Sequence, residues 1–382
     1  MRRGFSLSLD VIRFAAAMVV FVAHFSYSNI SGEWFEEIWA APFAHHAVIV
    51  FFVLSGFVIA YVASGRENTP QIYFRARLVR LYSVVLPMLV LVPLLDWIGH
   101  RLDPSPYEGW YNAYDPADAS KKVIAAMTFM HESWWSSFLY FSNRPYWSIA
   151  YEFWYYVAFA ALCFLRGRRR VLALAAIVAL TGLKILLLFP VWLLGVGVWH
   201  VSTRCRLPAA VAAACLAGSI AAYVIWVNTG AYLDVEQAGN TLLETCGVPT
   251  SDLLWSEPWL AYYVLGLMVA LAFVSLSSLS DALEALLAPA ANLIRWAAGA
   301  TFTIYLLHVP MMFAVASLTP GDVDDPFRRT AVFAVTLVAL FAVAEVTERR
   351  KHAFGVAYDY LDGKLRSLFR PHRSILSHGR HL

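Results

Sequence analysis

Charged residues are scarce in this sequence. Asp, Glu, Lys and Arg make up 14% of its 382 residues, whereas soluble domains contain about 25%. The shortage excludes a soluble globular protein, and the hydrophobic share of 60% excludes a disordered chain, because so much apolar surface has to leave water. The net charge of +3 is too small to attract a nucleic acid. We therefore expect an integral membrane protein that contacts the lipid bilayer and has no nucleic-acid partner.

Cysteine and the common cofactor motifs are scarce as well. The chain has only four cysteines, and they lack the close spacing of metal ligands. The sequence also contains no Walker loop, no Rossmann fingerprint and no Gly-x-Ser-x-Gly nucleophile elbow. We therefore expect neither a disulfide framework nor a metal site.

Long apolar runs dominate instead. A helix needs roughly 20 mostly apolar residues to cross about 30 Å of hydrocarbon. Runs of that kind predict an all-α fold, a polytopic integral membrane helix bundle of about ten transmembrane helices. The predicted spans are residues 8 to 28, 43 to 64, 78 to 98, 147 to 165, 171 to 188, 190 to 203, 208 to 228, 258 to 278, 292 to 318 and 329 to 347.

The distribution of Lys and Arg orients this bundle, because short cytoplasmic loops collect basic residues. Residues 122 to 140 are an eleventh apolar candidate, but a crossing there would move the Arg-rich segment 166 to 170 outside. We interpret 122 to 140 as re-entrant or external, which puts both termini in the cytoplasm. The acidic stretch 229 to 257 is then an external loop. The chain is predicted to be one transmembrane domain, residues 1 to 348, with a basic cytoplasmic tail, residues 349 to 382.

Ionisable residues inside a membrane domain are costly and mark functional sites by default. Arg13 and His24 are eleven residues apart in the first span, which is about 16 Å along a helix and nearly a whole number of turns, so both lie on one face. Asp10 is placed to pair with Arg13. The alternatives are a neutralised cation at the interface and a histidine bonded between helices.

Two further groups share these levels. Glu152 and His308 are predicted to lie near the depth of His24, so three proton-handling groups share one layer. Arg77 and Arg80 lie three residues apart on one helical face, near the level of Arg13, and paired guanidinium groups suit phosphates. A purely topogenic role explains a basic cluster equally well.

Five motifs in order resemble those of the membrane acyltransferase-3 family of bacterial O-acyltransferases. The last follows the family's Tyr-x-Leu-His-x-Pro pattern. Two departures are Ser83, where the family usually has proline, and Arg350, where it has the proline of Glu-Arg-Pro. The matching stretches are Leu9 to Arg13 with His24, Phe51 to Phe57, Arg77 to Arg80, Trp147 to Tyr156, and Gly299 to Pro310.

The resemblance implies a reaction and roles for these residues. The donor would be acyl-coenzyme A, most simply acetyl-coenzyme A, with its phosphates held by Arg13, Arg77 and Arg80. His24 would act as general base on an acceptor hydroxyl or carry the acyl group transiently, and the sequence leaves both roles open. Glu152 would orient His24 or serve the helix structurally. The residues expected to support the catalytic groups or to contact the acceptor are Asp10, Trp147, Ser148, Tyr305 and His308.

The acceptor is predicted less directly. Aromatic residues in 107 to 114 and 134 to 147 suit stacking on sugar rings, which agrees with a carbohydrate or glycoconjugate acceptor, although an interfacial aromatic belt explains them equally well. The family resemblance places the protein in a bacterial inner membrane. The rival hypotheses are a polytopic transporter of an organic anion or sugar and a scaffold without catalysis. Only the enzyme would consume a thioester. The oligomeric state is not determined by the sequence.

Overall fold

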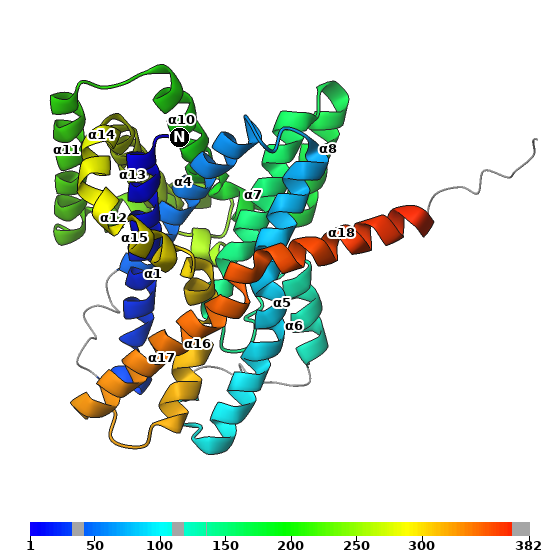
Figure 1. Ribbon diagram of the computed structural model, residues 1–382, viewed down its shortest axis with the longest axis vertical. Helices are drawn as coiled ribbons and strands as arrows, with labels where there is room; N and C mark the ends of the chain where they lie inside the picture. The colour runs from blue at the N-terminus through cyan, green and yellow to red at the C-terminus, as the bar shows by residue number, and fades with distance from the viewer. Residues whose placement is uncertain (33–41, 109–117, 135, 369–382) are drawn as a thin grey trace, which may run out of the picture.

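The computed structural model describes residues 1–32, 42–108, 118–134 and 136–368. Within these ranges the fold is all-α, without a β-strand, and the long helices stand side by side in a bundle (Figure 1). The helices of the first half are α1 (Arg3–Phe25), α2 (Ser28–Ser31), α4 (Phe43–Ala63), α5 (Pro70–Leu102), α6 (Ala119–Met127), α7 (Trp147–Phe164) and α8 (Gly167–Thr181). Those of the second half are α9 (Leu183–Leu187), α10 (Phe189–Arg204), α11 (Ala209–Asn228), α12 (Ala231–Thr245), α13 (Trp259–Ser278), α14 (Ser280–Leu287), α15 (Ala291–Ala298), α16 (Thr301–Leu318), α17 (Pro326–Val346) and α18 (Lys351–Leu368).

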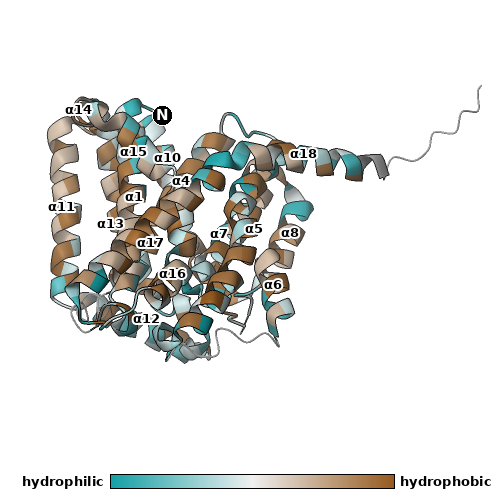
Figure 2. Ribbon diagram, turned by 60° about the horizontal axis from the view of Figure 1, so that its bottom comes forward, coloured by the Kyte–Doolittle hydropathy of each residue, from teal (hydrophilic) through white to brown (hydrophobic). Residues whose placement is uncertain are grey.

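The prediction of an all-α polytopic membrane bundle is confirmed. Hydrophobic residues cover the long helices between their ends, whereas hydrophilic residues gather at the ends (Figure 2). Eight candidate spans in the described chain are long and apolar enough to cross a membrane. α7 and α8 correspond to two more predicted segments but fall outside this set, because α8 has only 15 residues and α7 carries Glu152 and several polar aromatic rings.

Two helices at the centre of the bundle pack unusually closely. α4 and α10 meet at Gly56 and Gly195. A Cβ atom at Gly56 would lie 1.9 Å from the carbonyl oxygen of Trp192, and one at Gly195 would lie 1.9 Å from that of Val53. Only glycine allows this approach, and it fixes the face of α4 that points toward α7 and α16.

The predicted segment 171 to 188 is wrong in its bounds. α8 ends at Thr181, and the short helix α9 continues into α10, so that Leu183–Arg204 forms one candidate span. The chain turns at Gly182, which has φ +77°, a conformation that favours glycine. Trp134 packs against this turn and donates from its backbone N–H to the carbonyl of Thr181 at 2.9 Å.

The predicted span 292 to 318 is also divided. α15 ends at Ala298 and α16 begins at Thr301. The carboxylate of Glu348 accepts hydrogen bonds from the backbone N–H groups of Phe302 at 3.0 Å and Thr303 at 3.1 Å. These are donors that the first turn of a helix leaves without partners, so a residue 46 positions away in the chain stabilises the new helix start.

Three other predicted boundaries move. The span 78 to 98 is the middle of a longer helix, because Thr69 accepts from the N–H of Ile72 and Pro70 occupies the first turn. The loop 229 to 257 contains α12. The predicted tail begins with α18, which points sideways away from the bundle (Figure 1), and Arg75 of α5 forms an ion pair at 2.6 Å with its Asp359.

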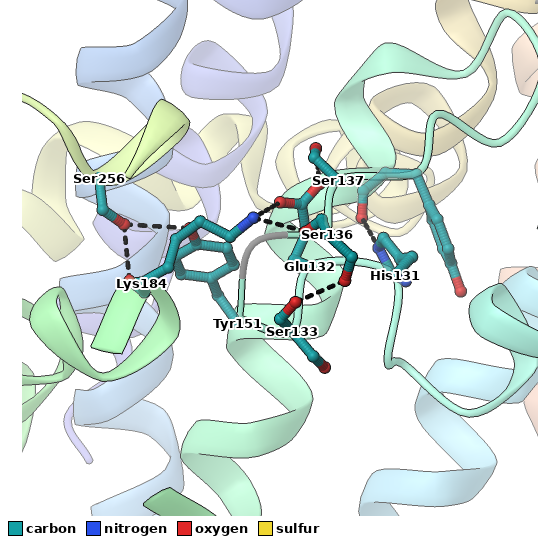
Figure 3. Close-up of polar contacts among 9 residues, drawn as sticks. His131, Glu132, Ser133, Ser136, Ser137, Tyr151, Lys184 and Ser256 are labelled. Atoms are coloured by element: carbon teal, nitrogen blue, oxygen red, sulfur yellow. Dashed lines mark hydrogen bonds and ion pairs between the residues drawn. The ribbon is translucent and has the colours of Figure 1, made fainter. Parts of the chain in front are cut away.

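Residues 122 to 140 do not form a spanning helix. The described residues between α6 and Arg144 form no regular helix, and a buried ion pair holds this segment against the bundle. The Nζ of Lys184 lies 2.9 Å from the carboxylate of Glu132, and each side chain is only 2% exposed. Ser137 donates to the same carboxylate at 2.7 Å, and Lys184 donates to the carbonyl of Ser136 at 2.7 Å (Figure 3). We call residues 128 to 143 the anchored loop.

Candidate functional site

A narrow cavity of about 60 Å³ lies in the middle of the bundle. α1, α4, α5, α7 and α16 enclose it, and four charged side chains line it: Arg13, Arg80, Glu152 and Glu348. Arg13 donates to Asp10 at 3.1 Å, as predicted, and to the carbonyl of Ala298 at 3.1 Å. The narrow cavity therefore presents two guanidinium groups and two carboxylates in a largely apolar setting.

Arg80 is the cation best placed to meet a ligand there. Its guanidinium makes no direct hydrogen bond within the described part of the chain, although it interacts electrostatically with Glu152 and Glu348. Arg13 also interacts electrostatically with Arg80. These two guanidinium groups come from different helices and converge on one small space, which is the arrangement that an anionic group requires.

Arg77 points elsewhere. It does not line the narrow cavity, and its Nη2 forms hydrogen bonds of 2.7 and 2.5 Å with the carboxylate of Glu67. Its guanidinium also lies 5.7 Å from the ring centroids of Tyr73 and Tyr156. Of the three arginines predicted to hold phosphates, Arg13 and Arg80 line the narrow cavity, whereas a carboxylate ten residues earlier in the chain holds Arg77.

Glu152 does not meet His24. Its carboxylate accepts hydrogen bonds from Ser55, at 2.9 Å, and from Tyr156, and it lines the narrow cavity, whereas His24 lines a different one. Trp192 supports this network by donating to Ser55 at 3.2 Å. The predicted layer of three proton-handling groups therefore contains the two histidines, with Glu152 among the charges of the narrow cavity.

His24 lines a wide cavity of about 780 Å³ beyond the narrow one. Its Nδ1 lies 2.8 Å from the carbonyl oxygen of Val20. A carbonyl accepts only, so Nδ1 must carry the proton and Nε2 keeps its lone pair. Arg144, His45 and His308 are its electrostatic neighbours. The backbone of α1 thus selects the tautomer that a general base or nucleophile requires.

His308 lies beside His24, as the helix geometry predicts. The two ring centroids are 4.8 Å apart, in an edge-to-face arrangement. The Nδ1 of His308 is within 3.0 Å of the carbonyl of Ile304 and 2.8 Å of that of Tyr305. Its Nε2 is buried and has no hydrogen-bond partner among the described residues. Both imidazoles are therefore held through Nδ1.

The two cavities meet at Tyr305. This residue and Val48 line both of them. The Tyr305 hydroxyl lies 2.7 Å from the Oγ of Ser148, which lines the narrow cavity, and donates at 3.2 Å to the carbonyl of Pro145, which lines the wide one. A single phenol thus separates the space around Arg13 and Arg80 from the space around His24.

The rest of the wide cavity combines aromatic rings with charges. Trp147 and Trp255 stack at 5.1 Å with an interplanar angle of 8°, and Arg144 lies 5.3 Å from the Trp255 ring centroid. Glu236 and Glu257 line another part of the wall. Burial raises the pKa of the Glu236 carboxyl, and the neighbouring charge of Glu257 raises it further. Flat rings and carboxylates together suit a polyhydroxylated ligand.

Several of these residues were missed by the sequence analysis. Trp255, Glu236 and Glu257 belong to the stretch interpreted as an external loop, and its acidity was the one available signal. Glu348 was visible only as part of the late Glu-Arg motif. Of the aromatic residues from 134 to 147, Trp147 lines the cavity, whereas most of 107 to 114 lies outside the described residues. No group of three metal-ligating side chains occurs in the described ranges.

The fold and the site define a multi-pass membrane protein with two adjoining internal cavities, one bearing paired guanidinium groups and the other a histidine. The family model described as an acyltransferase domain matches residues 6–345. The chain therefore belongs to the acyltransferase-3 family, as the motifs suggested, and is a membrane acyltransferase. No curated protein and no solved structure matches it.

Proposed function

We propose that this protein is an O-acyltransferase of a bacterial inner membrane that moves an acyl group from acyl-coenzyme A to a hydroxyl of a carbohydrate or glycoconjugate. By the positive-inside rule both termini are cytoplasmic, so the donor comes from the cytoplasm and the acceptor meets the wide cavity from the other side. The observation that carries the proposal is the meeting of the two cavities at Tyr305, with guanidinium groups on one side and His24 on the other.

The donor is held by Arg13 and Arg80, whose guanidinium groups converge on the narrow cavity and bind phosphate oxygens by charge-assisted hydrogen bonds. Arg13 and His24 are about 16 Å apart along α1, so a slender pantetheine arm extends from one level to the other. Arg77 supports this site indirectly, because its ion pair with Glu67 lies against the ring of Tyr156, the donor to Glu152. The proposed acyl group is acetyl, the simplest one that the family resemblance implies.

His24 performs the proton transfer. His24 lines the wide cavity, and in the tautomer that the Val20 carbonyl selects its Nε2 takes the proton of the acceptor hydroxyl as that oxygen attacks the thioester carbon. Direct attack by Nε2, which would form a transient acyl-imidazole, uses the same atom. His308 packs against the ring and holds its position.

The acceptor occupies the wide cavity. Trp147 and Trp255 offer faces on which a sugar ring stacks, and Glu236 and Glu257 accept hydrogen bonds from hydroxyl groups. A volume of about 780 Å³ accommodates one or two sugar rings rather than a proton or a small ion. This composition favours a carbohydrate acceptor over a simple organic anion.

The test is binding and turnover of acetyl-coenzyme A by the purified protein in detergent, with release of free coenzyme A as the readout. We expect wild type to bind and turn over the thioester. The His24→Ala variant should keep binding and lose turnover, whereas the double variant Arg13→Gln/Arg80→Gln should lose binding. His131→Gln is the matched control, because His131 is a buried histidine outside both cavities.

Each contrary outcome has a definite meaning. Wild type without affinity for any acyl-coenzyme A would overturn the proposal, and solute uptake into vesicles would then test the transporter. Full turnover by His24→Ala would remove His24 from the chemistry while leaving the enzyme class intact.

A further inference from the structure

The hydroxyl pair of Tyr305 and Ser148 lies where the two cavities adjoin. Tyr305 is on α16 and Ser148 is on the first turn of α7, so helices distant in the sequence bring the two oxygens to 2.7 Å. Both side chains are buried, at 6% and 4% exposure. Phe51 packs edge-to-face on the Tyr305 ring at 5.6 Å and fixes its orientation. The phenol is therefore a positioned donor at the boundary between the proposed donor and acceptor spaces.

We propose that Tyr305, supported by Ser148, is the oxyanion donor of the acyl transfer. This inference rests on the proposed function. The acceptor oxygen, losing its proton to Nε2 of His24, forms a bond to the thioester carbon, and the carbonyl π electrons move to the carbonyl oxygen. That oxygen becomes an oxyanion and accepts a hydrogen bond from the Tyr305 O–H. The C=O bond then re-forms, the C–S bond breaks, and the coenzyme A thiolate takes the proton from His24.

The hydrogen bonds of Tyr305 favour it for this task. Its O–H donates to the Pro145 carbonyl at 3.2 Å, a long bond that is weakly held, and is free to turn to a stronger acceptor. While the phenol donates to Pro145, the Ser148 hydroxyl, 2.7 Å from the phenol oxygen and 3.4 Å from the Pro145 carbonyl, can donate to the phenol oxygen and increase the polarity of its O–H. A donor aimed at developing charge in a site from which water is excluded stabilises the transition state more than the ground state.

Three polar side chains near Tyr305 have their donors engaged elsewhere. His24 and His308 both direct Nδ1–H to backbone carbonyls, so their protons are already engaged. The Oγ of Ser55 donates to Glu152. The Tyr305 ring lies 6.3 Å from that of His308, whose ring lies 4.8 Å from that of His24, and Tyr305 and His24 both line the wide cavity, so base and oxyanion donor border the same space.

The experiment compares Tyr305→Phe, Ser148→Ala and the double variant with wild type in coenzyme A release from acetyl-coenzyme A, with water as acceptor. We expect Tyr305→Phe to lower kcat by about 10²- to 10³-fold with an unchanged Kd for acetyl-coenzyme A. Ser148→Ala should lower kcat by about tenfold, and the double variant should be no worse than Tyr305→Phe, because the two hydroxyls act as one unit.

Tyr151→Phe is the control. Tyr151 is a buried tyrosine on α7 that bonds to Ser256 at 3.0 Å and lines neither cavity, so its kcat should stay within about twofold of wild type. Retention of wild-type kcat by Tyr305→Phe would overturn the inference while leaving the proposed function standing. No turnover by wild type would overturn the proposed function itself. If Tyr305→Phe does not fold, the kcat of Ser148→Ala tests the inference instead. An unchanged kcat in that variant would overturn the proposed role of Tyr305 and Ser148.

Discussion

The two cavities that meet at Tyr305 are built from different kinds of structure. Every residue that lines the narrow cavity belongs to a helix, including the single turn Glu348–Arg350. The wide cavity is closed partly by segments outside the long helices, namely the anchored loop, the turn Leu254–Ser256 and the amphipathic helix α12. Side chains on packed helices hold their positions more precisely than side chains on loops. Loops, in turn, tolerate changes of sequence more readily than helices do.

This difference matches two different tasks. A donor such as coenzyme A has one fixed structure, and a small cavity with four charges at set positions suits a single ligand. The proposed acceptor belongs to a varied class of molecules, the carbohydrates, and a large cavity with loop-borne walls allows its lining to change without disturbing the bundle. The comparison predicts that substitutions in the wall of the wide cavity change acceptor binding and protein stability. Substitutions in the narrow cavity should instead change donor binding.

The largest effect is expected from breaking the ion pair of the anchored loop. Lys184→Met would leave the Glu132 carboxylate buried without its cation, which costs about 3–5 kcal/mol of unfolding free energy. The measurement is denaturant unfolding in detergent, together with acetyl-coenzyme A binding below the transition. Binding should persist, because the narrow cavity has no residue in this loop.

The matched control replaces both members of the pair. Glu132→Leu/Lys184→Met should recover most of the lost stability, since apolar residues of similar volume commonly substitute for a buried ion pair without loss. If the single variant were as stable as wild type, the anchored loop would not depend on the pair. Loss of donor binding in a folded single variant would contradict the separation of the two cavities.

A second prediction compares two arginines one turn apart on α5. Arg80→Gln should weaken acetyl-coenzyme A binding by about 10- to 100-fold, the range expected for a lost charge-assisted hydrogen bond. Glu67→Gln/Arg77→Gln removes the other guanidinium together with its partner and should change the Kd much less, because that pair lies outside the narrow cavity. Isothermal titration in detergent measures both. Equal losses would return Arg77 to the binding site.

The sequence predicted the helices and part of the site because both depend on regular geometry. Hydrophobic runs locate spanning helices, and the rise of 1.5 Å per residue places His24 above Arg13 on α1. The meeting of His24 with His308 follows from the same arithmetic, even though the span 292 to 318 is divided at Gly299 and Ala300. Periodicity survives small errors in the boundaries.

The orientations of the other side chains in the site could not be predicted, because they are set by tertiary contacts that the sequence does not reveal. The direction of the Arg77 guanidinium is set by Glu67 and by two tyrosine rings, none of which its helical position reveals. Glu152 faces Ser55 and Tyr156 rather than His24 for the same reason. The acceptor-side wall was hidden because Trp255 and Glu236 come from short elements whose place against α4 and α7 is fixed only by packing.

The third prediction concerns pH. His131 stacks on Tyr146 at 4.5 Å, its Nε2 donates to the Tyr146 carbonyl at 3.2 Å, and burial lowers its pKa from 6.5 to about 4. The folded protein therefore favours the neutral ring, while the unfolded chain binds a proton between pH 6.5 and 4. Unfolding free energy should fall as the pH drops through this window, by about 2 kcal/mol between pH 6.5 and 4.5 from this one group.

His131→Gln keeps a donor for the Tyr146 carbonyl and removes the titration. Denaturant unfolding at pH 6.5, 5.5 and 4.5 should give the variant a shallower dependence on pH than wild type, with the difference largest at pH 4.5. Parallel slopes would mean that His131 is hydrated or already charged in the folded protein. His131 belongs to the anchored loop, which contributes to the wall of the wide cavity and not to the narrow cavity. Acid should therefore loosen this wall before it affects the narrow cavity. The affinity of the His131→Gln variant for acetyl-coenzyme A should accordingly equal that of wild type at all three pH values.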